Sequence, residues 1–473
     1  MIRTFTEIAQ SHLGRIAVIV VAALTMSWIA LWNGFPLLYP DSMTYMDDGR
    51  VVARALFLHQ RSAYYGIRSF IYSMGILPFH WNIKPWPVVA LQALLVAWLL
   101  WLTVRSILHR HTVLCYLALV VTLSLITTLS WYVPLILPDI LGPVLYLSIY
   151  LIVFAPETLT RAERWALYIV SWWCIASHAT HLMLAAGLCV LLGLVALLGR
   201  SKRIARLQSV AQVALIVLAS AASQLALNGY LYGHPSLNGE RPPFLTARII
   251  ADGPGRWYLD KNCSQLNWVI CRHISQVSSD PDNFLWGSDG LWPNLTADEG
   301  NQLMEEEMPF VLATLRAYPA SELKRAASSV WEQLGIFGLN DLDPSGYTLS
   351  QFPYVLPGAR AAYVRSRQGR NAIPLDDITT FQFWVVAASL AIIVAFTPWL
   401  ACKRPSRLLG LTLIIFAVEL ANAVVTSTLS MVEDRFQARV VWLIPMLAGL
   451  LILSWLQSGQ SPPQKQIGQQ AEP

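Results

Sequence analysis

Two aspartates of this chain stand directly beside long apolar segments, where their carboxylates could take part in a reaction. Asp41 follows the first apolar segment in LLYPDSMTYMDDGR, and Asp139 lies between two later ones in PLILPDILG. A carboxylate at the mouth of an apolar span is costly unless it meets water or is retained for chemistry. General base catalysis, in which the carboxylate removes a proton from an attacking group, is the chemistry that such a position favours.

The surroundings of each aspartate leave a structural alternative open. Asp41 follows Pro40 and precedes a run that favours a helix, so it could cap that helix by accepting backbone N–H bonds. Tyr45 shares a helix face with it at a spacing of four residues. Asp139 follows Pro138 and could likewise do no more than cap the next span. We therefore predict that Asp41 and Asp139 are catalytic residues.

Cations near the same segment ends are candidates for binding a phosphate. HQRSAYYGIRSF places Arg61 and Arg68 on a predicted interfacial helix, and Lys84 lies close to the start of the second span. Arginine and aromatic side chains at a membrane surface are also ordinary anchors. The functional interpretation is that Arg61 or Lys84 pairs with a lipid phosphate through charge-assisted hydrogen bonds.

Two further pairs lie at later turns. SHATH offers His178 and His181, but nothing supplies a third metal ligand at a motif spacing, so we predict a substrate or phosphate contact and no metal site. In SMVEDRFQARVVWLIP, Arg435 and Arg439 share one helix face at a spacing of four. They are predicted to bind phosphate, the alternative being ion pairs with the adjacent Glu433 and Asp434.

Composition indicates the elements that must position these residues. Of 473 residues, 55% are hydrophobic and only 13% are charged, which predicts an all-α polytopic membrane protein. Stretches long enough to cross a bilayer predict about ten spans, at 15–36, 86–104, 113–133, 139–155, 165–177, 182–199, 208–229, 378–401, 407–428 and 438–457.

The positions of Lys and Arg predict the orientation of these spans. With the N-terminus in the cytoplasm, the short basic loops all fall inside, as the positive-inside rule requires. The net charge of +5 then reflects membrane anchoring and predicts no nucleic-acid partner. The predicted organisation is an N-terminal transmembrane module (1–229) with a first outer loop (37–85), an outer-face soluble domain of mixed or helical structure (230–376), C-terminal transmembrane helices (377–457) and a disordered cytoplasmic tail (458–473).

Cysteine usage is consistent with that orientation. Cys263 and Cys271 are the two cysteines of the predicted outer domain, close enough in sequence to form a disulfide in an oxidising compartment. The alternative is a pair of buried thiols.

Several short motifs resemble those of the GT-C superfamily of integral-membrane glycosyltransferases, which includes protein mannosyltransferases and the aminoarabinose transferases of lipid A. They are P-D-S-x-x-Y after the first span, R-S-x-x-Y-G in the first loop, P-D at the next outer turn and D-R-F-x-x-R-x-x-W-L-x-P before the last span. The resemblance covers 15–229 and 378–457. It implies that Asp41 acts as catalytic base or binds the acceptor.

The same resemblance implies a polyprenyl-phosphate sugar as donor, a lipid or glycan as acceptor, and membrane lipids as surroundings. It places the enzyme in a bacterial inner membrane with its active site facing the periplasm. Many members carry an Asp-Glu pair where Ser42 follows Asp41 here. No cofactor is therefore certain, and a requirement for a divalent cation stays open.

Two other functions compete with sugar transfer. A lipid-linked glycan polymerase or ligase would carry its cations in the large outer segment, where Arg241, Arg248 and Arg256 are available. A transporter would concentrate polar groups at the bilayer midplane and show internal repeats. Glu419, an acid inside a span whose partner the sequence does not identify, favours transport, whereas the remaining polar groups cluster at outer helix ends.

Overall fold

The computed structural model describes residues 11–60, 62, 68–198, 207–237, 239, 241–402 and 407–458. Arg61 and the predicted tail from 459 onward lie outside the described residues. Within them every regular element is a helix, and an isolated bridge joins Leu37 to Leu135. The prediction of an all-α protein is confirmed.

Six helices are long and apolar enough to cross a membrane, by their length and composition. They are α6 (Trp86–Ile107), α11 (Ala179–Leu198), α12 (Leu207–Tyr232), α22 (Leu375–Cys402), α23 (Arg407–Leu429) and the stretch formed by α24 (Asp434–Ala438) and α25 (Leu443–Ser458). Shorter apolar helices are α2 (His12–Met26), α7 (Thr112–Ile126) and the unit of η1 (Pro138–Ile140) with α9 (Leu141–Phe154). The predicted span at 165–177 falls in α10 (Arg161–Ala176). The count of ten spans stays a prediction.

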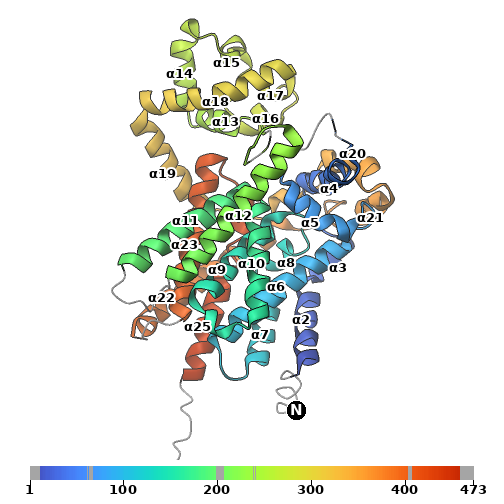
Figure 1. The fold of residues 1–473 in the computed structure, drawn as a ribbon, viewed down its shortest axis with the longest axis vertical. Coiled ribbons are helices and arrows are strands. Elements are labelled where there is room, and N and C mark those ends of the chain that lie inside the picture. Colours follow the sequence, from blue (N-terminus) through green and yellow to red (C-terminus); the bar gives the residue numbers. More distant parts are fainter. Residues whose placement is uncertain are drawn as a thin grey trace, which may run out of the picture.

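These helices pack around α9, which lies at the centre of the bundle (Figure 1). Every residue of α9 from Leu141 to Val153 is buried, and α6, α10, α12 and α23 surround it. Its sequence, LGPVLYLSIYLIVF, is apolar on all sides, as a helix without a solvent or lipid face must be. Because η1 precedes α9 directly, Asp139 lies buried at the N-terminal end of this helix.

A separate helical head stands at one end of the bundle (Figure 1). We call residues 244–317 the head, and its own apolar core includes Phe284, Leu303 and Phe310. A disulfide joins Cys263 to Cys271 within it. Its elements are α13 (Phe244–Ala251), α14 (Pro254–Asn262), η3 (Cys263–Gln265), α15 (Val269–Arg272), η4 (Ile274–Gln276), α16 (Pro281–Trp286), α17 (Leu291–Asn294) and α18 (Ala297–Ala317). Helix α19 (Pro319–Gly335) leads back from the head and packs along α23.

The part of the predicted outer domain that follows α19 packs on the bundle. Gln368 joins it to the first loop, because its side-chain amide donates to the carbonyl oxygens of Leu38 and Leu342 and its Oε1 accepts from the Leu38 N–H. The elements of this part are η5 (Asn340–Leu342), α20 (Gly346–Val355), η6 (Pro357–Ala359) and α21 (Arg360–Arg365). They lie near α4 (Pro40–Leu58), which packs against α5 (Phe70–His80). The remaining short helices are α3 (Trp28–Asn33), α8 (Leu129–Tyr132) and η2 (Pro156–Thr158).

Candidate functional site

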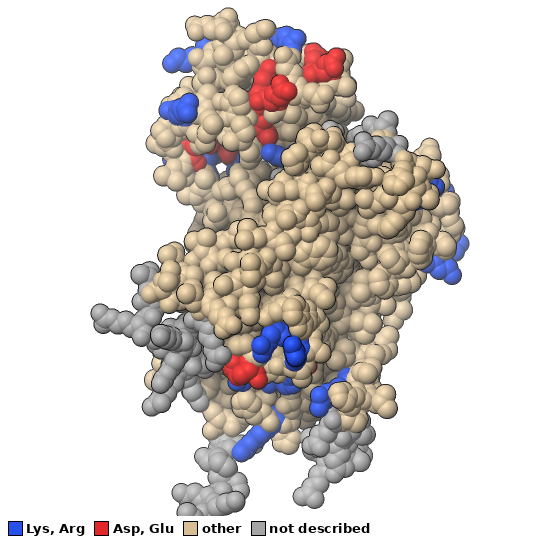
Figure 2. Space-filling model, in the orientation of Figure 1, with Lys and Arg blue, Asp and Glu red and all other residues tan. Residues whose placement is uncertain are grey.

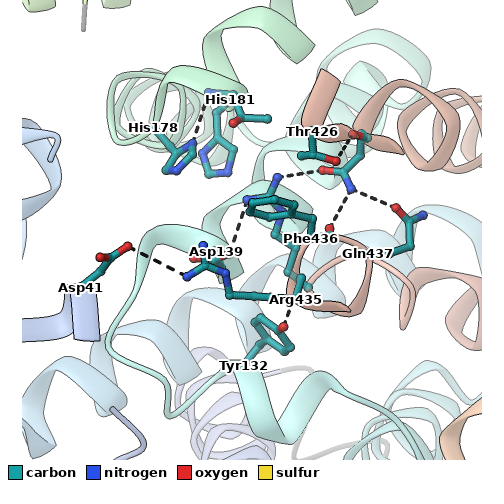
Figure 3. Close-up of polar contacts among 12 residues, drawn as sticks. Asp41, Tyr132, Asp139, His178, His181, Thr426, Arg435, Phe436 and Gln437 are labelled. Atoms are coloured by element: carbon teal, nitrogen blue, oxygen red, sulfur yellow. Dashed lines mark hydrogen bonds and ion pairs between the residues drawn. The ribbon is translucent and has the colours of Figure 1, made fainter. Parts of the chain in front are cut away.

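Residues from distant parts of the chain meet in one polar cluster (Figure 3). Helix α4 brings Asp41, η1 brings Asp139, and the segment of α24 brings two arginines. Arg68 joins them from the first loop. We call Asp41, Arg68, Asp139, Arg435 and Arg439 the arginine–aspartate cluster.

Asp41 lies inside the first turn of α4 and does not cap this helix. The N-cap is Tyr39, whose backbone N–H donates to Ser42 Oγ at 3.0 Å. The carboxylate of Asp41 is therefore directed elsewhere. Its Oδ1 accepts from Arg68 at 2.6 Å, and its Oδ2 lies 4.0 Å from Arg435 Nη1. Asp41 thus stands between two cations with its side chain still 18% exposed, so that it remains accessible.

Asp139 and Arg439 form a buried ion pair between the start of α9 and the end of α24. Arg439 Nη1 lies 3.3 Å from Asp139 Oδ1, and the arginine side chain is only 1% exposed. Arg439 Nη2 donates to Asn422 Oδ1 at 2.8 Å. Two buried charges survive out of water only when paired and hydrogen-bonded in this way. The carboxylate of Asp139 therefore does more than cap α9.

Glu419 is linked to this buried pair through two side-chain amides. Gln437 Nε2 donates to Glu419 Oε2, and Asn422 Nδ2 donates to Gln437 Oε1 at 3.1 Å. Asn422 then accepts from Arg439 with its oxygen. The chain of hydrogen bonds gives Glu419 the partner that the sequence did not identify, and it fixes the orientation of Asn422 toward Arg439.

Arg435 carries a guanidinium group whose donors are not used. It lies over the ring of Tyr39 at 4.2 Å and is paired at 3.8 Å with Asp341, a separation beyond hydrogen-bonding reach. The separation from Asp41 is equally too long. Within the described chain its guanidinium makes no hydrogen bond, and its Nε is buried without a partner. None of the described ion pairs joins it to Glu433 or Asp434.

The backbone that carries Arg435 is held from two sides. Tyr132 Oη donates to the carbonyl of Arg435 at 3.1 Å (Figure 3). Thr128 Oγ1 donates to the carbonyl of Ala438 at 2.7 Å. On the other side, Gln333 of α19 bonds both backbone groups of Glu433: its Nε2 donates to the carbonyl at 2.8 Å and its Oε1 accepts from the N–H at 3.0 Å. The position of the unused guanidinium is thus fixed before any ligand arrives.

His178 and His181 project from the start of α11 toward the arginine side chains (Figure 3). Their rings lie 5.3 Å apart. His181 Nδ1 lies 2.9 Å from the carbonyl of Cys174, which can only accept, so Nδ1 carries the proton and Nε2 faces the interior as a buried acceptor. Burial, His181 and the positive charge of Arg439 lower the pKa of His178 well below its usual range. Both histidines therefore add neutral polar groups to the site.

Two of the predicted phosphate ligands are not part of this site as described. Arg61 lies outside the described residues, and Lys84 is exposed at the turn between α5 and α6. The structure adds Arg68, Asn422 and Asp341, none of which was assigned a role from sequence. Arg68 was at least noted beside Arg61, whereas Asp341 carries no local signal at all. Among the described residues, no group of three or more His, Cys, Asp or Glu side chains could hold a metal ion.

A polar cavity of about 300 Å³ opens beside the cluster, between α13, α16, α19 and the turn that ends at Glu433.

Burial, together with the charges of Asp341 and Asp282, raises the pKa of Glu433 to about 7 from the ordinary 4.5. The folded protein then keeps a proton that the unfolded chain loses above pH 4.5. Its stability should therefore fall as the pH rises from about 4.5 to about 7.

We expect Glu433→Gln to remove this part of the pH dependence. The amide cannot ionise, so the variant should gain stability relative to the parent protein above pH 7 and lose that advantage near pH 5. Thermal unfolding in detergent at pH 5, 6, 7 and 8 measures the difference. Parallel stability profiles for the two proteins would contradict it.

No protein-family model, curated protein or solved structure matches this chain.

Proposed function

We propose that this protein is a membrane glycosyltransferase of the GT-C type, which transfers a sugar from a polyprenyl-phosphate donor to a lipid or glycan acceptor. The proposal places the reaction on the periplasmic face of a bacterial inner membrane, where the loop charges predict the head and the cluster to lie. The observation that carries it is Arg435, a fixed and largely buried guanidinium with unused donors beside the Asp41 carboxylate. Such a guanidinium is suited to bind a phosphate, because two phosphate oxygens can accept hydrogen bonds from its two parallel N–H groups.

The cluster supplies the groups that sugar transfer requires. Asp41 takes the proton from the acceptor hydroxyl while that oxygen forms its bond to the anomeric carbon of the donor. The bond from this carbon to the phosphate oxygen breaks, and its electron pair leaves with the polyprenyl phosphate. Arg435 stabilises the charge that develops on the departing phosphate. The reaction is a single displacement and forms no covalent enzyme intermediate.

The arrangement of the head favours transfer over polymerisation or ligation. The three cations that a polymerase or ligase could use are all occupied: Arg241 pairs with Glu307, Arg248 with Asp252 and Arg256 with Asp260, at 2.7–2.9 Å. A guanidinium that already has a carboxylate partner must exchange it to bind a phosphate. The ion pairs of Arg435 with Asp41 and Asp341 are longer, at 4.0 and 3.8 Å, and use no hydrogen bond, so this exchange costs Arg435 less.

The test is a transfer assay with Arg435→Lys as its central variant. The purified chain is reconstituted in lipid nanodiscs with a panel of polyprenyl-phosphate sugars, and released polyprenyl phosphate is followed by mass spectrometry. Lysine keeps the charge but loses the fork and the stacking on Tyr39, so the KM for the donor should rise on the order of tenfold or more.

Arg50→Lys is the matched control, because Arg50 makes a half-exposed ion pair with Asp47 on the same helix, α4, outside the cluster. Its KM should stay within about twofold of the parent value, since exposed ion pairs contribute little. If no donor supports turnover, the proposed function fails. If Arg435→Lys behaves like the control while the parent protein turns over a donor, the phosphate site lies elsewhere.

A further inference from the structure

A groove of about 650 Å³ lies between α10 and α12, in the half of the bundle remote from the head. Its position is independent of the arginine–aspartate cluster and of the function proposed for it. Apolar and aromatic side chains form most of its wall, and two arginines stand at one end. The lining residues are Arg161, Arg164, Trp165, Tyr168, Ile169, Trp172, Gln212, Leu215, Ile216 and Ala219.

The side chains of α10 and α12 are hydrogen-bonded to the other helix at one end of the groove only. Trp172 Nε1 donates to Ser223 Oγ at 3.0 Å, Ser220 Oγ donates to the carbonyl of Trp172 at 3.2 Å, and Gln224 Nε2 donates to that of Ala176 at 3.0 Å. These hydrogen bonds all fall in the C-terminal parts of α10 and α12. Between the N-terminal halves of α10 and α12, the described residues make no such hydrogen bond. The large side chains of Trp165 and Leu215 there stay mostly exposed.

At the charged end of the groove, none of the ion pairs in the described chain joins a carboxylate to Arg161 or Arg164. Glu163 accepts from both terminal nitrogens of Arg105, at 2.9 and 2.8 Å. Glu157 accepts from Arg407. Arg164 donates to the carbonyl of Pro156, and its Nε is buried without a partner. In the described part of the chain, Arg161 belongs to no ion pair. Figure 2 shows basic side chains at this end of the molecule, below a broad band without charged residues.

We propose that this groove binds one anionic phospholipid. The phosphate of the head group lies against Arg161 and Arg164, and an acyl chain follows the apolar wall past Ile169 toward Ala219. Basic pockets between membrane helices select anionic head groups because each cation adds attraction that a zwitterionic lipid does not gain in full. The aromatic rings near the arginines suit the boundary between head group and hydrocarbon.

The test compares lipids on the intact chain. The protein is purified in detergent, and binding of phosphatidylglycerol and phosphatidylcholine is measured by native mass spectrometry and by the rise in Tm. We expect phosphatidylglycerol to bind at least about fivefold more tightly. Arg161→Gln combined with Arg164→Gln should abolish this preference, and Arg161→Gln alone should weaken it if the double variant fails to fold.

Two further variants distinguish lipid binding in the groove from unspecific attraction of anionic lipid by positive surface charge. Ala219→Trp leaves both arginines in place and fills the apolar part, so it should weaken binding of both lipids. Arg110→Gln removes an exposed cation outside the groove and should change nothing. Equal affinity for the two lipids overturns the proposal, as does an effect of Arg110→Gln equal to that of Arg161→Gln. Stabilisation by inorganic phosphate alone, equal to that by phosphatidylglycerol, would show an ion site and not a lipid site.

Discussion

Asp139→Asn is expected to lower the free energy of unfolding by about 3–5 kcal/mol, the cost of leaving a buried charge without its partner. Arg439 is almost fully enclosed and its carboxylate partner is 3.3 Å away, so the variant keeps the guanidinium in place without a counter-charge. Asn422 would still accept from it, but a neutral amide oxygen does not replace a carboxylate. Equilibrium unfolding in detergent measures the loss.

Two companion variants identify the cause of that loss. Adding Arg439→Gln to Asp139→Asn removes both charges and should restore part of the stability, because the remaining groups are neutral amides. Asp260→Asn breaks an exposed pair with Arg256 on the head and should cost at most about 1 kcal/mol. An Asp139→Asn variant as stable as Asp260→Asn would mean that the central pair contributes little.

Asp41→Asn is expected to reduce transfer on the order of 10²-fold or more, as removal of a general base does. The amide retains the shape of the carboxylate and can still accept from Arg68, so the chain should fold and bind the donor. Turnover in nanodiscs, with Tm as a check on folding, measures the effect.

Asp47→Asn, on the same helix, is the matched control and should leave turnover near that of the parent protein. Its carboxylate pairs only with Arg50 among the described ion pairs and takes no part in the cluster. If Asp41→Asn turns over as fast as this control, Asp41 serves to hold Arg68 and is not the base.

The positions of the candidate residues at helix ends were predictable, because proline and charge interrupt the apolar runs there. The sequence could not indicate which of these helix ends lie together in the folded protein. Asp41 and Arg68 lie 27 residues apart across a loop. The segment of Asp341 is held at the site by Gln368, which donates to Leu38 and Leu342, and by Asn340, which donates to Asp434. Such contacts depend on tertiary amide hydrogen bonds, which leave no periodic pattern in the chain.

Helix breaks inside two of the predicted spans could not be predicted from hydropathy either. The span at 15–36 is divided at Ser27, whose Oγ donates back to the carbonyl of Ala23, and the span at 113–133 is divided at Thr127, which bonds Leu123 in the same way. Hydroxyl side chains that bond the preceding turn are known to bend helices. Hydropathy treats both stretches as continuous, yet the second break creates α8, which holds the backbone of Arg435.

The separation of 300 residues between Asp139 and Arg439 has a consequence for biosynthesis. When the ribosome has delivered α9 to the membrane, the arginine that will neutralise Asp139 has not yet been made. An unpaired carboxylate is costly in hydrocarbon, so we expect the start of α9 to stay in contact with water until the final helices are translated. We expect a nascent chain that ends before Arg439 to keep this carboxylate without its partner and to leave the packing around the start of α9 incomplete.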